Sequence, residues 1–103
     1  MENNDRIIFL VIITGRKQKN LILNDILENG VRLVNTSYGK GTVCANYLLN
    51  TFGLVPEKNK SIISCVSTYS KINAVMNMLN EKYNFDKPNT GIAFTVPVEK
   101  VSF

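Results

Sequence analysis

The sequence predicts an α+β domain in which strands and helices follow one another in the order β-α-β-β-α-β. Apolar, β-branched runs at residues 6–13 and 61–67 have the length and composition of buried strands. Apolar residues at helical spacing follow each of the two runs. A stretch of about twenty residues, 39–59, separates the second strand from the third, and a loop of that length in a small domain is usually functional.

The first half of the chain predicts a strand, a helix and a second strand. Residues 6–13 are apolar on both alternating faces, which indicates a central strand that is covered on both sides. The spacing of leucine and isoleucine predicts a helix over residues 18–29, and Gly30 can end it because glycine readily adopts the left-handed conformation. Residues 31–37 alternate well enough to predict the second strand.

The second half repeats the pattern after the insert. Residues 61–67 predict the third strand, and the spacing of apolar residues predicts a helix over residues 70–83 whose first residue, a serine, is expected to cap it. Proline, asparagine and glycine indicate a turn at residues 86–91. The alternating residues 92–98 form a fourth strand, which we place at a sheet edge because Pro97 has no N–H to donate to a neighbouring strand.

This element order is that of a ferredoxin-like sandwich, and the length of 103 residues fits one domain over residues 1–103. With right-handed crossovers, both helices lie on the same face of the sheet. The first and third strands are nevertheless apolar on both faces, so the second face would present apolar side chains to solvent in a monomer. We therefore expect the chain to oligomerise through its sheet.

Composition narrows the classes of function. The chain contains no histidine, the commonest metal ligand and general base, so metal or acid–base chemistry is not expected. Cys44 and Cys65 are its two cysteines and are expected to be reduced and packed. The longest apolar run is too short to cross a bilayer, and the first residues lack the pattern of a signal peptide, which indicates a cytoplasmic protein. The net charge of +4 is spread along the chain and does not by itself identify a partner.

The sequence resembles the PII signal-transduction family, and more closely its short PII-like members. The resemblance rests on the element order, the glycines that follow the second strand, the long insert where PII proteins carry their T-loop, and residues 91–98, GIAFTVPV, which are similar to the strand after the family's B-loop. It implies a homotrimeric regulator and not an enzyme. Each cleft between neighbouring subunits would bind an adenine nucleotide such as AMP, ADP or ATP, and the T-loops would dock on a membrane transporter or a metabolic enzyme.

The resemblance also implies positions for the two sites. Gly39 and Lys40 match the glycine and the basic residue at the T-loop base, Cys65 falls where a strand residue meets adenine through its main chain, and Gly91 matches the last glycine of the B-loop. The expected nucleotide- or anion-binding residues are Gly39, Lys40, Gly41, Thr42, Cys65, Lys87, Thr90 and Gly91. The expected partner-binding residues in the T-loop are Tyr47, Leu48, Leu49, Phe52 and Leu54, an apolar cluster suited to a groove on a partner.

Physical chemistry supports an anion site at the start of the insert. Gly39 and Gly41 permit positive φ angles and close backbone approach, so the N–H groups around Lys40 can form an anion-binding nest. The chain departs from the family where Ile92 replaces the B-loop lysine, and no arginine follows it. With fewer positive groups, a less charged nucleotide such as AMP or ADP, or a small anion, fits better than ATP.

Three other classes of function are weighed against this one. A trimeric scaffold that binds no small ligand would share the fold and the apolar sheet. An acylphosphatase-like enzyme would use Arg16 after the first strand, but residues 15–20 lack the glycine-rich cradle that this chemistry needs. An RNA-binding domain stacks bases on aromatic residues of its first and third strands, and residues 61–67 contain none, so a nucleic-acid partner is not expected.

Overall fold

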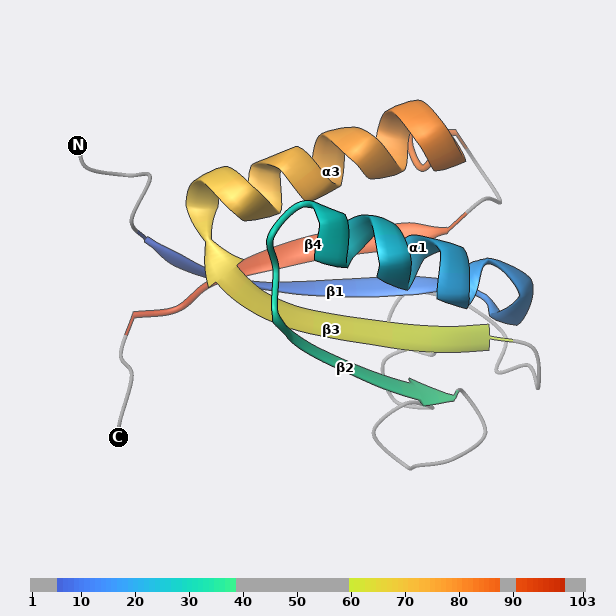
Figure 1. The fold of residues 1–103 in the computed structure, drawn as a ribbon, viewed down its shortest axis with the longest axis horizontal. Helices are drawn as coiled ribbons and strands as arrows, with labels where there is room; N and C mark the ends of the chain where they lie inside the picture. The colour runs from blue at the N-terminus through green and yellow to red at the C-terminus, as the bar shows by residue number, and fades with distance from the viewer. Residues whose placement is uncertain (1–5, 39–59, 88–90, 100–103) are drawn as a thin grey trace.

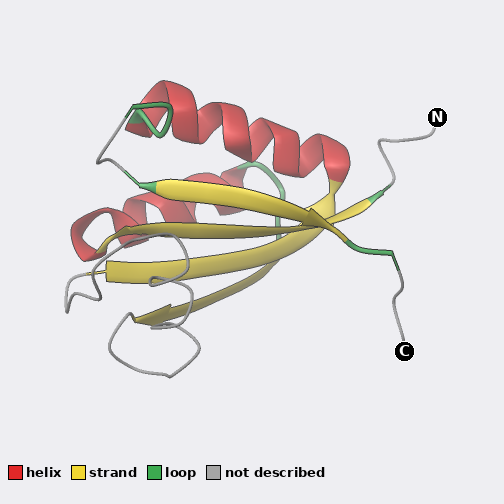
Figure 2. Ribbon diagram, turned by 180° about the vertical axis from the view of Figure 1, so that it is seen from behind, coloured by secondary structure: helices red, strands yellow, loops and turns green. Residues whose placement is uncertain are grey.

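The computed structural model describes residues 6–38, 60–87 and 91–99 and confirms the β-α-β-β-α-β order (Figure 1). In these segments, two helices and a four-stranded sheet form two layers, with both helices on the same face of the sheet (Figures 1 and 2). The elements are β1 (Ile7–Gly15), α1 (Arg16–Glu28), β2 (Leu33–Tyr38), β3 (Lys60–Thr68), α3 (Tyr69–Tyr83) and β4 (Ile92–Pro97).

The sheet is antiparallel, with the strand order β2-β3-β1-β4. The two doubly apolar strands, β1 and β3, are its centre, as their sequences predict. The placement of β4 at an edge is confirmed. In this strand order β4 pairs only with β1, so Pro97 does not have to donate an N–H to a strand on its other side. None of the helices in the described segments is long and apolar enough to cross a bilayer.

The main core lies between the sheet and the two helices. Alternation along β1 directs Ile8, Leu10 and Ile12 toward the helices, where they are buried. Burial of one such aliphatic side chain stabilises the fold by about 1.5–3 kcal/mol. The other buried members of this cluster are Ile22, Ile26, Val31, Ile63, Cys65, Ile72, Val75, Leu79 and Tyr83.

The second face of the sheet, here called the open face, is partly exposed. The sequence led us to expect exposed apolar side chains over this whole face. At its centre, however, Val11, Ile13 and Ile62 are buried. One row of apolar side chains across the sheet, formed by residues directly opposite one another in the register, is exposed at both edges and half-buried between them. This open-face row consists of Leu33 on β2, Val66 on β3, Phe9 on β1 and Val96 on β4. Leu33 is 71% exposed and Val96 is 45% exposed.

The boundaries of α1 differ from the sequence prediction for local reasons. The helix begins at Arg16 and not at residue 18. β1 pairs with β3 as far as Gly15, which is also the N-cap of α1, so no linker separates the strand from the helix. The helix ends at Glu28, and Gly30 has the left-handed conformation that its position predicts, with φ of 89°. Val31 is buried in the core below the helix layer, and β2 therefore begins only at Leu33.

The start of α3 corrects a second prediction. Ser70 does not cap this helix: the N-cap is Thr68, and no side-chain hydrogen bond caps it. The N–H of Tyr69 instead donates to the carbonyl oxygen of Arg6 at 2.8 Å, so one N–H group of the first turn is satisfied by the backbone that leads into β1. A partner so distant in sequence replaces the local cap.

Candidate functional site

One end of the sheet brings together the two ends of the insert and the residue that follows the turn after α3. β1 and β2 end there, whereas β3 and β4 begin there, because neighbouring strands are antiparallel. Figure 1 shows α3 ending on the same side of the molecule. This region, here called the insert end, is defined by the register pairs Gly15 with Lys60, Tyr38 with Ser61, and Ile13 with Ile92.

Most of the predicted site residues lie outside the described residues, so their prediction stands as it was. The structure shows only where the chain leaves and re-enters the sheet, at Tyr38 and Lys60. The residues in question are Gly39, Lys40, Gly41, Thr42 and Thr90 of the ligand site, and Tyr47, Leu48, Leu49, Phe52 and Leu54 of the partner site.

Two predicted ligand residues, Lys87 and Gly91, lie near the insert end. Gly91 immediately precedes Ile92, which is opposite Ile13 at that end of the sheet. The side chain of Lys87 is exposed, and its backbone N–H donates to the carbonyl oxygen of Asn84 at 3.0 Å, which forms a turn directly after α3. The two residues are separated by at most about 14 Å of extended chain. The chain therefore leaves the sheet at Tyr38, re-enters it at Lys60 and returns to it after Gly91 at the same end.

Basic side chains that the sequence analysis did not assign to the site also flank the insert end. Lys60 is opposite Gly15, and Arg16 and Lys17 begin α1 directly after it. The first turn of α1 contains no acidic residue, and its N-cap residue, Gly15, has no side chain that could cap the N–H groups. A helix N-terminus beside cationic side chains favours an anion. Only the register shows this grouping, because Lys60 is far from Arg16 in sequence.

Cys65 lies apart from the insert end. It is opposite Leu10 and Val34, five residues along β3 from Lys60, or about 16 Å at the usual rise per residue. Its side chain belongs to the main core, and burial raises the pKa of the thiol to about 11. The thiol is therefore protonated at neutral pH, and it is neither a ready nucleophile nor a metal ligand. A contact with a base can come only from its main chain, as the resemblance implies.

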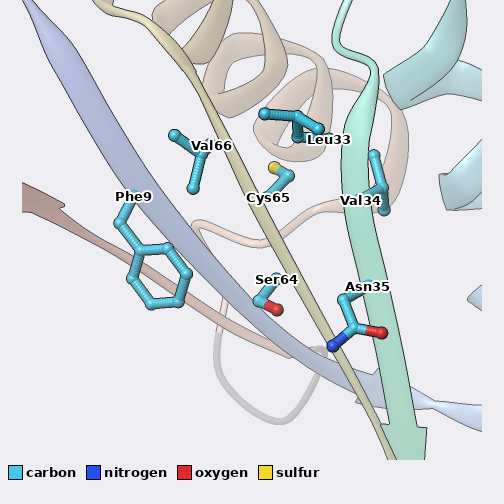
Figure 3. A pocket seen from close by; sticks show the side chains of 7 residues that line it. All are labelled: Phe9, Leu33, Val34, Asn35, Ser64, Cys65 and Val66. Carbon is cyan, nitrogen blue, oxygen red and sulfur yellow. The ribbon is translucent and has the colours of Figure 1, made fainter. Parts of the chain in front are cut away.

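A shallow hollow of about 360 Å³ includes Cys65 in its lining. β1, β2 and β3 all contribute residues to it, as Figure 3 shows. Apolar side chains form most of the wall, whereas Asn35 and Ser64 contribute polar groups. A flat, partly apolar group with hydrogen-bonding edges suits such a surface. The lining residues are Phe9, Leu33, Val34, Asn35, Ser64, Cys65 and Val66.

Asp25 forms a buried polar cluster between the two helices that the sequence analysis missed. Its carboxylate accepts a hydrogen bond of 2.5 Å from the Tyr83 hydroxyl, and Lys82 Nζ lies 2.9 Å from the same carboxylate oxygen. The hydrogen bond from Tyr83, followed by that from Lys82, lowers the pKa of Asp25. Burial, with the carboxylate as a second cause, raises the pKa of Tyr83 to about 12. The cluster joins α1 to the last turn of α3.

One signal in the sequence could have indicated this cluster. Asp25 follows Ile22 by three residues and immediately precedes Ile26, so a carboxylate lies on the face of α1 that both isoleucines mark as buried. A charged residue at such a position requires a partner, since an unpaired buried charge is costly. The identity of the partner, Tyr83, is set by the packing of the helices.

Metal binding has no visible basis in the part of the chain that the structure describes. Within residues 6–38, 60–87 and 91–99, no group of three or more histidine, cysteine, aspartate or glutamate side chains gathers to hold an ion. What the described residues do bring together is a cationic sheet end, a turn with an exposed lysine, and a separate apolar hollow with polar edges.

Comparison with known proteins gives a consistent match in structure. At the level of sequence, neither a protein-family model nor a curated protein matches the chain. The fold is similar to that of a putative PII-like signalling protein from Thermus thermophilus, with a TM-score of 0.66 and 12% identity over 91% of this chain and 87% of that one.

Two structures with bound ligands show the same similarity. CPII from Thiomonas intermedia, bound to ADP, AMP and acetate, matches with a TM-score of 0.62 and 14% identity over 93% of this chain and 91% of that one. The B. subtilis GlnK–ATP complex matches with a TM-score of 0.60 and 14% identity over 91% of this chain and 85% of that one. The chain therefore has the fold of PII and PII-like signalling proteins, which confirms the ferredoxin-like sandwich with its long insert.

Proposed function

We propose that this chain is a divergent member of the PII family, a cytoplasmic regulator and not an enzyme. It binds an adenine nucleotide or a small anion and passes that signal to a membrane transporter or a metabolic enzyme through residues 39–59. The observation that carries the proposal is that Tyr38 and Lys60, which flank the insert, lie at the same end of the sheet as Ile92, which Gly91 leads into, and that Lys60, Arg16 and Lys17 make this end cationic. That arrangement occurs in a fold shared with proteins solved in complex with ADP, AMP and ATP.

The ligand in this proposal lies along β3. A nucleotide's base contacts the hollow at Cys65 and its phosphates point toward the insert end, whereas a small anion binds at the insert end alone; Lys40, Lys60 and Lys87 are the positive groups proposed to attract either one. Fixed positive groups and uncapped N–H groups stabilise an anion there through charge-assisted hydrogen bonds. With only a few lysines close by, this site favours AMP, ADP or a small anion over ATP.

The open-face row supports assembly of the chain as a homotrimer. Leu33 and Val96 present exposed apolar side chains at the two edges of the sheet, with Phe9 and Val66 between them. Contact with another subunit would remove this apolar area from water, which is the main driving force of association. The hollow borders the same row, since it shares Phe9, Leu33 and Val66 with it, so a neighbouring subunit would also close the ligand site.

Ligand binding tests the regulatory function directly. Thermal-shift measurements and calorimetry with AMP, ADP, ATP, cyclic nucleotides and bicarbonate should identify at least one ligand that raises the melting temperature. A ligand at a hundred times its Kd stabilises the folded state by about 2.7 kcal/mol. We expect Lys40→Gln to weaken that ligand by about tenfold or more, because it removes a charged hydrogen-bond donor.

The control for Lys40→Gln is Lys71→Gln, the same change at an exposed position on α3, which should bind the ligand as the unaltered protein does. An unchanged melting temperature with every compound would overturn ligand sensing and favour the trimeric scaffold without a small ligand. Sedimentation analysis tests assembly separately, and a monomer at micromolar concentration would contradict the homotrimer.

A further inference from the structure

The ring of Phe85 lies directly against the backbone of Gly91. An alanine Cβ at position 91 would be 2.5 Å from Phe85 Cζ and 2.8 Å from Phe85 Cε2. Favourable contacts between carbon atoms have separations of about 3.5–4.0 Å. Any side chain at position 91 would therefore displace either the ring or the start of β4.

A steric reason for this glycine is visible in the structure. Among the three glycines within residues 6–38, 60–87 and 91–99, only at Gly91 would an added Cβ come closer than 3.4 Å to another atom. Gly15 offers a direct contrast. Its backbone is extended, with φ of −69° and ψ of 149°, and a Cβ there would meet no atom within 4 Å. Glycine is sterically required at position 91 and not at position 15.

The end of α3 holds Phe85 in place. Asn84 turns the chain with φ of 60°, and the N–H groups of Asn84 and Phe85 both donate to the carbonyl oxygen of Leu79, with a length of 3.2 Å for Phe85. The Phe85 side chain also packs against the main core. The ring is thus positioned by the helix and the core, independently of the segment that follows it.

The same short segment also contacts the other side of the turn. The N–H of Lys87 donates to the carbonyl oxygen of Asn84 at 3.0 Å, so Asn84 contacts Lys87 while the next residue, Phe85, contacts Gly91. We propose that Phe85 is a positioning residue, whose ring sets where Gly91, a predicted ligand residue, lies at the insert end next to the start of β4. The expected effect of Phe85 on ligand affinity rests on the proposed function, whereas the contact between Phe85 and Gly91 does not.

A double-variant cycle tests the contact without any ligand. Gly91→Ala should lower the melting temperature by about 5–15 °C, as overpacking in a domain of this size does. Phe85→Leu by itself should also lower the melting temperature, because it removes packing from the core. In the Gly91→Ala background, however, it removes the ring atoms that would collide with the new Cβ. The Gly91→Ala/Phe85→Leu double variant should therefore melt at a higher temperature than Gly91→Ala. Gly15→Ala is the matched control, and its combination with Phe85→Leu should be additive. If Phe85→Leu lowers the melting temperature equally in the Gly91→Ala and unaltered backgrounds, the contact is refuted.

Calorimetry with ADP tests positioning, at a temperature where all variants are folded. Phe85→Leu and Gly91→Ala should each weaken ADP by about tenfold, which corresponds to about 1.4 kcal/mol, while Lys71→Gln, a change at an exposed position on α3, binds as the unaltered protein does. A folded Phe85→Leu variant with unaltered ADP affinity would show that Phe85 has only a structural role, and would overturn the proposal. If the unaltered protein binds no nucleotide or anion, the proposed function fails, and the melting cycle still decides whether Phe85 sets the position of Gly91.

Discussion

Replacement of Tyr83 by phenylalanine tests the buried link between α1 and α3. The change removes one hydroxyl, which donates to the Asp25 carboxylate at 2.5 Å, and leaves the ring in the core. Asp25 is only 8% exposed, so water cannot fully replace this donor. A hydrogen bond to a charged group contributes about 1.5–3 kcal/mol, and we expect a loss of this size in the free energy of unfolding, or roughly 10 °C in melting temperature.

The pH dependence of that loss follows from the two pKa shifts. The folded state lowers the pKa of Asp25, so its contribution is present above the pKa of the unfolded carboxyl and disappears as pH falls through the folded value. The folded state raises the pKa of Tyr83 from 10.0 to about 12. The contribution of Tyr83 to the free energy of unfolding is therefore complete below pH 10 and disappears as pH rises to about 12. The stability difference between the unaltered protein and Tyr83→Phe should therefore be largest between these limits.

Urea unfolding followed by circular dichroism, repeated across pH, measures this difference. Tyr69→Phe is the matched control, since Tyr69 begins the same helix but is 42% exposed, and surface substitutions usually change stability by less than about 0.5 kcal/mol. The reasoning is refuted if Tyr83→Phe destabilises no more than Tyr69→Phe, or if its effect is the same in strong acid as at neutral pH.

Three further outcomes are expected. Lys82→Met should cost at most about 1 kcal/mol, because Lys82 is 60% exposed beside Asp25, and the loss should shrink in high salt; an unchanged loss in high salt would contradict an ionic origin. Leu33→Lys should shift the sedimentation coefficient toward that of a monomer, because it places a charge in the open-face row, and an unchanged coefficient would exclude this row from the interface. Iodoacetamide at pH 8 should leave Cys65 unmodified in the native protein and label it in urea, as peptide mass spectrometry can show; labelling of the native thiol would contradict its burial.

The sequence by itself determined the type and order of the elements. Apolar residues on both faces mark β1 and β3 as central strands, helical spacing marks α1 and α3, and Gly30 marks the end of α1. These signals depend on the conformational preferences of neighbouring residues and on burial of one face, which a few consecutive positions are enough to reveal. The placement of β4 at an edge also followed from a single residue, Pro97.

Only the tertiary structure decided which distant residues meet. The N–H of Tyr69 donates to the carbonyl oxygen of Arg6, and so a local serine cap is unnecessary. Asp25 finds Tyr83 across the helix layer, and Phe85 gives Gly91 a steric reason to be glycine. Register across four strands aligns the open-face row and gathers the basic residues of the insert end. Such contacts arise from packing and strand pairing over long separations, and local propensity carries no information about either.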